Sequence, residues 1–501
     1  MKRLFTAATV GIATLAAVTF APVAEATTGP PVVRTAQGAV RGTSGPLGAS
    51  FQGIPYATAE RFAAPRPAAS WTGVRDATAP GKVCAQPLGY PIGRPSTDED
   101  CLTVNVATPA RHRGRLPVIV WIHGGSMMFG MGDLYGPGRL AAGGAVVVSM
   151  NYRLGVTSFL THPALPESGS LALDDQRAAL RWVRDNIRAF GGDPGRVTIM
   201  GQSGGGFSVC GHLASPASAG LFQRAIVQSA PCGETGHASR TRAEALADSA
   251  PVIAAVGCAD RADVAGCLRA VPIERLLAAF GTDREPRPLS GTPALPLPVG
   301  EALRTGRFSR VPVLIGVNHD EENGRILGQE LATGTPMARE DYEPAVRKAY
   351  GSRAAAVLKR YPLGDSAGQT FAAVLTDELW AAPSLDTART LSRWTPTRMY
   401  EFAEQDTPWY AGYPAPSFPV AAQHMAELAY LFDVPLFEKL TPAQSALADR
   451  LIGAWVHFAA TGETGWPRLR DSRSGWYVQS LTSGAWKRAD FTTDHHYRFW
   501  S

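Results

Sequence analysis

A serine flanked by glycines is the first feature of this chain that could do chemistry. The segment MGQSGGG, residues 200–206, places Ser203 two residues from Gly201 and two from Gly205. Strand-forming residues precede the serine, and GGGFSVCGHL after it can open a helix. A strand–serine–helix turn exposes a nucleophile, and its neighbours must be small because a Cβ would crowd the strand and the helix. The pattern predicts that Ser203 is a nucleophile, with a glycine-rich structural turn as the alternative.

A nucleophilic serine needs a base, and the base needs an acid that orients it. When the serine lies on such a turn, the order along the chain is nucleophile, acid, base. Acidic residues that follow a strand are concentrated in NHDEEN, as Asp320, Glu321 and Glu322. Among the later histidines, His424 follows the loop GYPAPSFPVAAQ, and a loop on a rigid scaffold suits a base. We therefore expect His424 to be the base.

The other histidines fit this role less well. His457 lies in RLIGAWVHFAA, a strongly helical stretch in which we expect it to pack. His495 and His496 lie close to the C-terminus. His123 precedes Ser203 along the chain, so we expect a structural role for it.

Backbone donors for a developing oxyanion are also present in the sequence. HGGS, residues 123–126, follows an apolar run and offers N–H groups flanked by glycine. Gly204, the residue after the serine, supplies a further N–H group. Met127, Met128 and Phe129 then either line the acyl side of a pocket or pack in the core.

Several elements must position these residues. Continuous apolar runs favour strands that are covered on both faces, and 175–190 carries an apolar stripe at helical spacing. Strands that alternate with helices predict a mostly parallel α/β sheet, with 235–310 and 325–385 as helical insertions over it. The expected strands are 116–122, 145–150, 196–200, 225–229 and 311–317.

The composition narrows the class of protein. The chain has 501 residues, is 45% hydrophobic and 18% charged, and carries a net charge of +5 without a basic stripe, so we expect no nucleic-acid partner. Lys2 and Arg3 precede an apolar run and the small-x-small sequence Ala24-Glu25-Ala26. This pattern predicts a signal peptide over 1–26, a single mature domain over 27–501, and a secreted protein without stable membrane insertion.

The six cysteines are Cys84, Cys101, Cys210, Cys232, Cys258 and Cys267. Export favours disulfides, and the even number permits full pairing. No C-x-x-C motif is present, so we expect no structural zinc, and nothing in the sequence calls for a cofactor.

Long motifs in a fixed order give the chain its resemblance to a known family. It resembles the type-B carboxylesterases, which include cholinesterases and bacterial para-nitrobenzyl esterases. The likeness implies an α/β-hydrolase fold, a small-molecule ester substrate, an acyl-enzyme on Ser203, His424 as base, Glu321 as acid, and oxyanion donors at Gly125, Ser126 and Gly204. The motifs are FQGIPYA, EDCLTVNV, HGGS, NYRLG, DQRAALRWVRDNIRAFGGDP, GQSGG, HMAELAYLF and WVHFAATG, from Phe51 to about Trp466.

The same resemblance implies two disulfides, Cys84–Cys101 and Cys258–Cys267. Cys210 and Cys232 either form a third bridge or leave Cys210 as a buried thiol on the helix after Ser203. We also assign two structural ion pairs, Arg61–Glu99 and Arg153–Asp175.

Three positions depart from the family pattern. Ser126 stands where the family has a third glycine, Glu322 replaces the glycine of its DEG motif, and Gln202 replaces the glutamate before the nucleophile. Without that glutamate a cationic ester group needs an aromatic face, for which Trp71, Trp380 and Trp409 are candidates. We therefore expect neutral esters of short-to-medium acyl length to be preferred over choline esters.

Two classes of function remain open from the sequence. One is a serine ester hydrolase, and within it a lipase, a lactonase or an amidase is an alternative to a carboxylesterase. The other is a catalytically silent binding module, because folds of this kind also serve binding. The presence of both Ser203 and His424 favours the enzyme.

Overall fold

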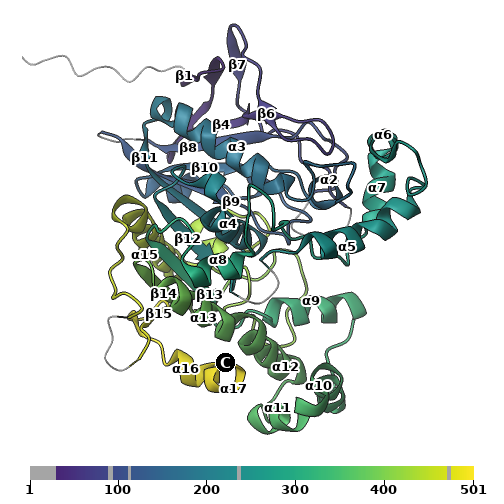
Figure 1. The fold of residues 1–501 in the computed structure, drawn as a ribbon. Helices are drawn as coiled ribbons and strands as arrows, with labels where there is room; N and C mark the ends of the chain where they lie inside the picture. Colours follow the sequence, from purple (N-terminus) through teal and green to yellow (C-terminus); the bar gives the residue numbers. More distant parts are fainter. Residues whose placement is uncertain (1–29, 88–93, 111–113, 234–237, 471–474) are drawn as a thin grey trace, which may run out of the picture.

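The computed structural model describes residues 30–87, 94–110, 114–233, 238–470 and 475–501 (Figure 1). The expected signal peptide, 1–26, lies outside the described residues.

An eleven-stranded sheet forms the centre of the molecule. Its middle strands, from β10 through β9 and β11 to β15, are parallel, and antiparallel strands complete both edges. In order across the sheet the strands are β16 (Lys487–Arg488), β15 (Val478–Leu481), β14 (Thr397–Phe402), β13 (Val313–Asn318), β12 (Arg224–Gln228), β11 (Gly192–Gln202), β9 (Leu116–Ile122), β10 (Val146–Met150), β8 (Thr103–Pro109), β4 (Gly48–Pro55) and β3 (Thr43–Gly45).

Helices cover both faces of this sheet, and each face has its own apolar core. Helices of one face are α3 (Leu171–Asn186), α4 (Gly204–Ala214), α8 (Val299–Thr305) and α13 (Ala382–Leu391). Helices of the other face are α1 (Gly138–Ala142), α14 (Leu428–Leu431) and α15 (Pro442–Thr461). This is the mostly parallel α/β architecture that the sequence predicts.

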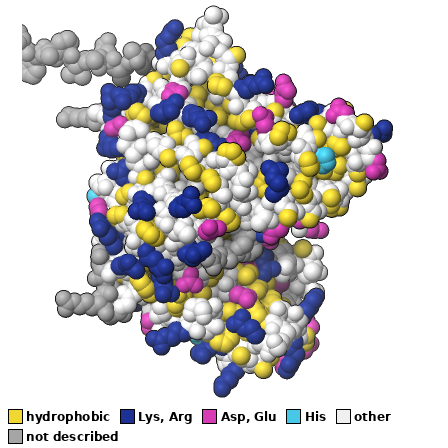
Figure 2. Space-filling view, viewed as in Figure 1, with side chains coloured by type: hydrophobic (Ala, Val, Ile, Leu, Met, Phe, Trp, Pro, Cys, Tyr) yellow, Lys and Arg dark blue, Asp and Glu magenta, His cyan; other side chains and the backbone are white. Residues whose placement is uncertain are grey.

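Two groups of helices extend from one side of the sheet layers, where Figure 2 shows two projections with a recess between them. The first group is α5 (Arg242–Ala255), α6 (Val264–Ala270) and α7 (Ile273–Phe280), which pack with the short α2 (Gly155–Phe159). The second is α9 (Asn323–Thr333), α10 (Tyr342–Tyr350), α11 (Ala354–Arg360) and α12 (Ala367–Thr376). On the face in Figure 2, basic side chains are scattered among acidic ones and form no continuous stripe.

Short elements complete the chain. Helices α16 (Phe491–Asp494) and α17 (Tyr497–Trp500) form the C-terminal segment, residues 491–501. Small sheets join β1 (Val32–Arg34), β2 (Ala39–Arg41) and β7 (Val74–Asp76), and β5 (Ala57–Thr58) with β6 (Arg66–Pro67). The 3₁₀ turns are η1 (Gly132–Leu134), η2 (Ile187–Phe190), η3 (Pro216–Ser218), η4 (Arg339–Asp341) and η5 (Gly351–Arg353), and η6 (Asp377–Ala381) is a π-helical turn.

The expected strands are all present, but β11 begins at Gly192, four residues earlier than expected. Its pairing with β9 shifts register between Gly192 and Val197, so the turn-like GDPG sequence is accommodated inside a strand. Sequence reasoning missed β14 because it carries Arg398 and Glu401, which are buried in ion pairs rather than exposed.

Three disulfides are present, Cys84–Cys101, Cys210–Cys232 and Cys258–Cys267. The alternative of a buried thiol at Cys210 is therefore wrong, because the Cys210 sulfur is bonded to that of Cys232. Both side chains are fully buried, so the bridge belongs to the core between α4 and the segment after β12.

Candidate active site

Ser203 occupies the sharp turn between β11 and α4. Its backbone has φ 55° and ψ −125°, an uncommon conformation for a residue with a side chain. The Ser203 N–H donates to the carbonyl of Gln228 on the neighbouring strand β12, at 2.9 Å. Pairing with the sheet thus holds the strained turn in place, as a nucleophile elbow requires.

Close packing explains the glycines on both sides of this turn. A Cβ at Gly201 would lie 2.4 Å from the carbonyl oxygen of Gly205. A Cβ at Gly205 would lie 2.0 Å from the carbonyl oxygen of Ile122, at the end of β9. Only glycine fits at either position, as the sequence predicts.

His424 and Glu321 meet although 103 residues separate them. The Nδ1 atom of His424 lies 2.5 Å from Oε2 of Glu321, and the other carboxylate oxygen accepts from the N–H of Asn318 at 2.9 Å. The His424 N–H also donates to the Glu321 carbonyl, at 3.1 Å. Side-chain and backbone hydrogen bonds therefore both hold the imidazole against this carboxylate. The Glu321 side chain is fully buried, and 25% of the His424 side-chain surface is exposed.

The two adjoining acids have different partners. Asp320 contacts Nδ1 of His319 at 3.2 Å and accepts from the amide of Gln405. Glu322 accepts from the indole N–H of Trp380 at 2.7 Å and pairs with Arg325. Of the three acids, Glu321 alone hydrogen-bonds to the His424 ring.

Two opposing effects act on His424. Burial lowers its pKa, because the charged form loses hydration, and the adjacent Glu321 raises it by its charge and its hydrogen bond. Glu427 and Glu322 add to the second effect, so that the pKa of His424 lies above the ordinary value of 6.5.

The HGGS loop lies against the serine turn. Three consecutive residues have positive φ, Gly125 at 97°, Ser126 at 54° and Met127 at 56°. A Cβ at Gly204 would lie 3.0 Å from the Ser126 nitrogen and 2.9 Å from that of Met127, so Gly204 abuts these N–H groups. Ser126 is exposed although its neighbours are buried, which shows that this part of the loop borders an opening.

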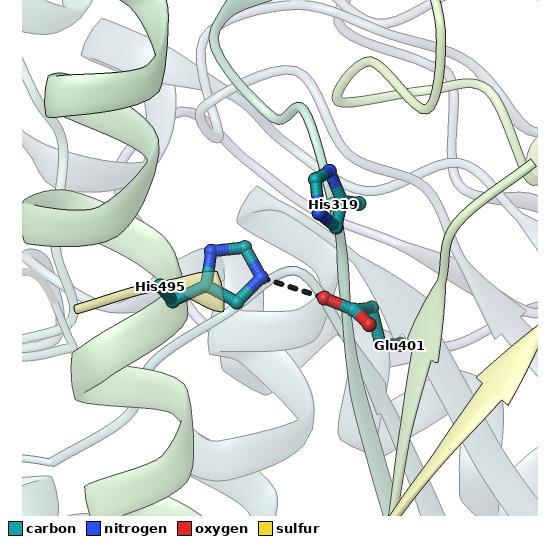
Figure 3. A group of neighbouring side chains, drawn as sticks. All are labelled: His319, Glu401 and His495. Atoms are coloured by element: carbon teal, nitrogen blue, oxygen red, sulfur yellow. Dashed lines mark hydrogen bonds and ion pairs between the residues drawn. The ribbon is translucent and has the colours of Figure 1, made fainter. Parts of the chain in front are cut away.

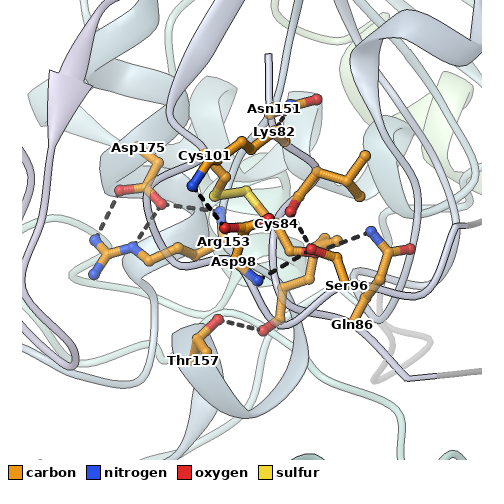
Figure 4. Close-up of a disulfide and its surroundings, with 12 residues drawn as sticks. Lys82, Cys84, Gln86, Ser96, Asp98, Cys101, Asn151, Arg153, Thr157 and Asp175 are labelled. Atoms are coloured by element: carbon orange, nitrogen blue, oxygen red, sulfur yellow. Dashed lines mark hydrogen bonds and ion pairs between the residues drawn. A yellow bond between two sulfur atoms is a disulfide. The ribbon is translucent and has the colours of Figure 1, made fainter. Parts of the chain in front are cut away.

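A disulfide-linked segment supports the far end of this loop. Gln86 makes two hydrogen bonds with the backbone of Gly130, donating to its carbonyl at 3.0 Å and accepting from its N–H at 2.9 Å. The Cys84–Cys101 bridge lies two residues away, beside the Arg153–Asp175 ion pair (Figure 4). No sequence pattern points to Gln86, because its partner is a backbone group.

His123 is structural, as expected. Its ring stacks on that of Tyr152 at a centroid distance of 4.3 Å, and Nδ1 lies 2.9 Å from the Gly124 carbonyl. The Tyr152 hydroxyl donates to the His123 carbonyl at 2.7 Å. Complete burial lowers the pKa of His123 to about 4, so that the ring is neutral at ordinary pH.

Gln202 has a role that sequence reasoning missed. Its amide Nε2 donates to the backbone carbonyl of His424 at 2.6 Å, from a side chain that is 2% exposed. A glutamate carboxylate cannot donate to a carbonyl oxygen. Gln202 therefore links the turn that carries Ser203 to the segment that carries His424.

Glu427 is a second residue that the sequence did not reveal. It is buried and accepts from Gln228 at 3.0 Å and from the side chain of Asn318 at 2.6 Å. Burial, with a smaller contribution from the charge of Glu321, raises the pKa of Glu427 to about 7. In the sequence, the only feature that pointed to Glu427 was its position three residues after His424.

The late histidines differ from expectation in one case. His457 lies on α15 but is exposed, so the expectation that it packs there is wrong: it falls on the helix face opposite the buried Trp455 and Phe458. His496 is half-buried and lies next to α17.

His495 belongs to a buried ion network (Figure 3). Its Nδ1 atom lies 2.6 Å from Asp377 and its Nε2 atom 2.6 Å from Glu401, and the ring of His319 packs on it at 5.0 Å. His319, Glu401 and His495 have the residue types of a metal site. Both ring nitrogens of His495 are nevertheless engaged by carboxylates, which describes an imidazolium donating two protons rather than a metal ligand.

The other residues that the sequence analysis singled out lie partly at the site and partly elsewhere. Met127 packs in the core of one sheet face, whereas Met128 and Phe129 pack with α5 to α7. Trp380 packs against His424 in a tilted arrangement at a centroid distance of 4.5 Å. Trp71 and Trp409 hydrogen-bond to backbone carbonyls at other places, the first beside β2 and the second beside Phe418. Arg61 pairs with Glu99, as expected.

The fold and these contacts are those of an α/β-hydrolase. The sequence matches the carboxylesterase family over residues 29–500, and the chain belongs to this family. It is 34% identical to the para-nitrobenzyl esterase of Bacillus subtilis (strain 168), covering 88% of this chain and 93% of that protein. It is 33% identical to the cocaine esterase of Homo sapiens, over 90% of this chain and 86% of that one.

Solved structures give the same result. A para-nitrobenzyl esterase superposes with a TM-score of 0.74 at 32% identity, over 93% of this chain and 99% of that chain. A thermophilic para-nitrobenzyl esterase gives 0.76 at 30% identity with the same coverage. The chain is thus a carboxylic ester hydrolase of the α/β-hydrolase fold. Within the part of the chain that the structure describes, no helix has the length and apolarity needed to span a membrane.

Proposed function

We propose that the protein is a secreted serine carboxylesterase that hydrolyses neutral esters through an acyl-enzyme on Ser203. The observation that carries the proposal is the 2.5 Å contact between His424 and Glu321, two residues expected as base and acid from distant parts of the sequence. Ser203 on a strained turn and the abutting HGGS loop supply the remaining groups.

The proposed reaction has two similar halves. Ser203 Oγ attacks the ester carbonyl carbon while His424 takes its proton, and the backbone N–H groups of Gly125, Ser126 and Gly204 stabilise the oxyanion. The intermediate collapses by breaking the bond to the alcohol, which leaves with the proton from His424. Water then attacks the acyl-enzyme in the same way and releases the acid. Glu321 stabilises the imidazolium that forms in each half.

A fluorophosphonate probe tests this assignment. We expect a stoichiometric adduct on the Ser203 peptide of the wild type and none in Ser203→Ala, with folding checked by circular dichroism. A catalytically silent binding module would leave the wild type unlabelled. A panel of p-nitrophenyl esters, a lactone and an anilide would then separate the carboxylesterase from a lipase, a lactonase or an amidase.

Secretion is proposed from two features together. The N-terminal 26 residues have the pattern of a signal peptide, and the three disulfides suit an oxidising compartment. N-terminal sequencing of the exported protein should begin at Thr27. A protein retained inside the cell with Met1 intact would contradict this part of the proposal.

A further inference from the structure

The π-helical turn η6 (Asp377–Ala381) carries a side chain that touches the proposed base. The Trp380 ring packs against the His424 ring in a tilted arrangement, at a centroid distance of 4.5 Å and an interplanar angle of 48°. Its indole N–H donates to Glu322, the neighbour of the proposed acid, at 2.7 Å. Trp380 therefore joins the acid turn and the base through one side chain.

We propose that Trp380 is a positioning residue for His424, and that the C-terminal segment keeps Trp380 in place by anchoring η6. This inference rests on the proposed function of His424 as the base. In this arrangement the indole packs at a tilt against the imidazole, whose side chain keeps 25% of its surface exposed with the indole in place, and it limits rotation of the ring away from Glu321.

The sequence explains why a π turn forms at this place. Pro383 follows η6 and has no N–H with which to satisfy the carbonyl of Leu379, four residues before it. The Ala382 N–H instead donates to the carbonyl of Asp377, five residues back. Such turns interrupt α-helices and are frequent at functional sites. Here the turn separates α12 from α13 and presents Trp380 to the site.

The anchor is Asp377, the first residue of η6, which is 4% exposed. One of its carboxylate oxygens lies 2.6 Å from Nδ1 of His495, and the other accepts from the Tyr361 hydroxyl at 2.6 Å. That hydroxyl accepts in turn from the indole N–H of Trp500 at 2.6 Å. His495 and Trp500 both belong to the C-terminal segment, so two of its side chains hold one end of η6.

His495 also ties this anchor to the central sheet. Its Nε2 atom lies 2.6 Å from Glu401 on β14, and Figure 3 shows the two side chains directed at each other. A buried imidazolium between two carboxylates depends on both partners, because removal of one leaves a buried charge without compensation. The C-terminal segment, η6 and β14 are thereby fixed relative to one another.

The test compares Trp380→Leu and Trp380→Phe with wild type on a p-nitrophenyl ester. Trp380→Leu should lower kcat by about ten- to a hundredfold with little change in KM, because misplacing a base affects the chemical step. Trp380→Phe keeps an aromatic face on His424 and should retain most of kcat. Trp394→Leu is the matched control, since Trp394 is 37% exposed and its ring lies against the Arg310 guanidinium rather than against His424.

A pH profile distinguishes positioning from general destabilisation. The charged groups that face His424 are Glu321, Glu322 and Glu427, and all remain in Trp380→Leu. Removal of the indole admits water to the imidazole and favours its charged form, so the acidic limb of kcat/KM should move to higher pH. A Trp380→Leu enzyme with wild-type kcat and an unmoved limb would overturn the proposal, as would an equal loss in Trp394→Leu.

Asp377→Asn tests the route from the C-terminal segment. We expect the same two changes as in Trp380→Leu at smaller size, and a double variant no slower than Trp380→Leu alone, because both act on one element. Strictly additive losses would overturn the anchoring part. If Ser203→Ala kept its turnover, the proposed function itself would fail; loss of turnover in Ser203→Ala together with a normal Trp380→Leu would reject only this inference.

Discussion

At the scale of single residues, the assignment of the acid has the sharpest consequence. Glu321→Gln should reduce kcat by about 10³- to 10⁴-fold, because an amide no longer stabilises the imidazolium. Asp320→Asn should have a much smaller effect, since Asp320 contacts His319 and accepts from Gln405 and from the Ala422 N–H, but does not contact His424. Steady-state kinetics on one ester checks the order, and a larger loss in Glu322→Gln than in Glu321→Gln would show that the acid is misassigned.

The pH dependence of wild-type turnover follows from the same contact. His424 must be neutral to accept a proton. Burial lowers its pKa, but Glu321, together with Glu427 and Glu322, raises it above 6.5. Activity should therefore rise as pH increases through a midpoint above 6.5. Residual kcat/KM of Glu321→Gln should rise at a lower pH, because the main raising influence is gone. Equal midpoints in the two enzymes would argue against the pairing.

Gln202 affects both substrate charge preference and the position of the His424 segment, because its amide donates to the His424 carbonyl. Gln202→Glu loses the donor to the His424 carbonyl, so turnover of neutral esters should fall, and Gln202→Met should fall similarly without added charge. Beyond that shared loss, the glutamate should shift the ratio of butyrylthiocholine to p-nitrophenyl butyrate turnover about tenfold toward the cation, or 1.4 kcal/mol. A wild-type enzyme that preferred the thiocholine would refute the expected neutral preference.

These residues also show what sequence reasoning could reach. Chain order and local motifs pointed to Ser203 and His424, whereas among the three adjoining acids only the family resemblance pointed to Glu321. Gln86, Gln202 and Glu427 were missed because each contacts a group far along the chain, and in two cases that group is a backbone carbonyl or N–H. His457 shows the opposite failure, since helical periodicity alone did not fix which face of α15 would be buried.

At the scale of elements, the three disulfides close loops of different length. In the chain-entropy view the Cys210–Cys232 bridge, with a separation of 22 residues, contributes about 3 kcal/mol, slightly more than Cys258–Cys267 with a separation of 9. The double variant Cys210→Ser/Cys232→Ser should lose more stability than Cys258→Ser/Cys267→Ser, because both of its cysteines are fully buried whereas Cys267 is only partly buried. Urea unfolding of both variants measures this, and the reverse order would contradict it.

The ion network of the C-terminal segment predicts a dependence of stability on alkaline pH. Although burial alone would lower it, the hydrogen bonds and charges of Asp377 and Glu401 raise the pKa of His495 to about 10, above the 6.5 of the unfolded chain. The resulting stability is fully present below about 6.5, declines as pH rises, and is lost above about 10.

Unfolding free energies at pH 6, 8 and 10 test this for wild type against His495→Gln. The wild type should lose more stability over this range than the variant, because position 495 no longer titrates in the variant. Parallel curves for the two proteins would show that His495 is not held as an imidazolium.

At the scale of the whole molecule, the parallel strands bring the separate pieces of the site to one edge of the sheet. Ser203 follows β11, Asn318 ends β13 and Glu321 follows it, and the HGGS loop follows β9. The carboxyl ends of parallel strands meet at one edge, which is why motifs from across the chain converge. The fold class was predictable because these strands are continuous apolar runs, whereas β14 was hidden by buried charges that only their partners explain.

The acyl-enzyme is the central claim, and rapid quenching of the reaction with p-nitrophenyl butyrate tests it most directly. The account predicts a burst of p-nitrophenol and a butyryl group on the peptide that contains Ser203, with neither in Ser203→Ala. A linear time course without burst could reflect slow acylation, so the attachment site decides. Turnover in which the butyryl group is found on another residue, or in which Ser203→Ala remains active, would contradict the account.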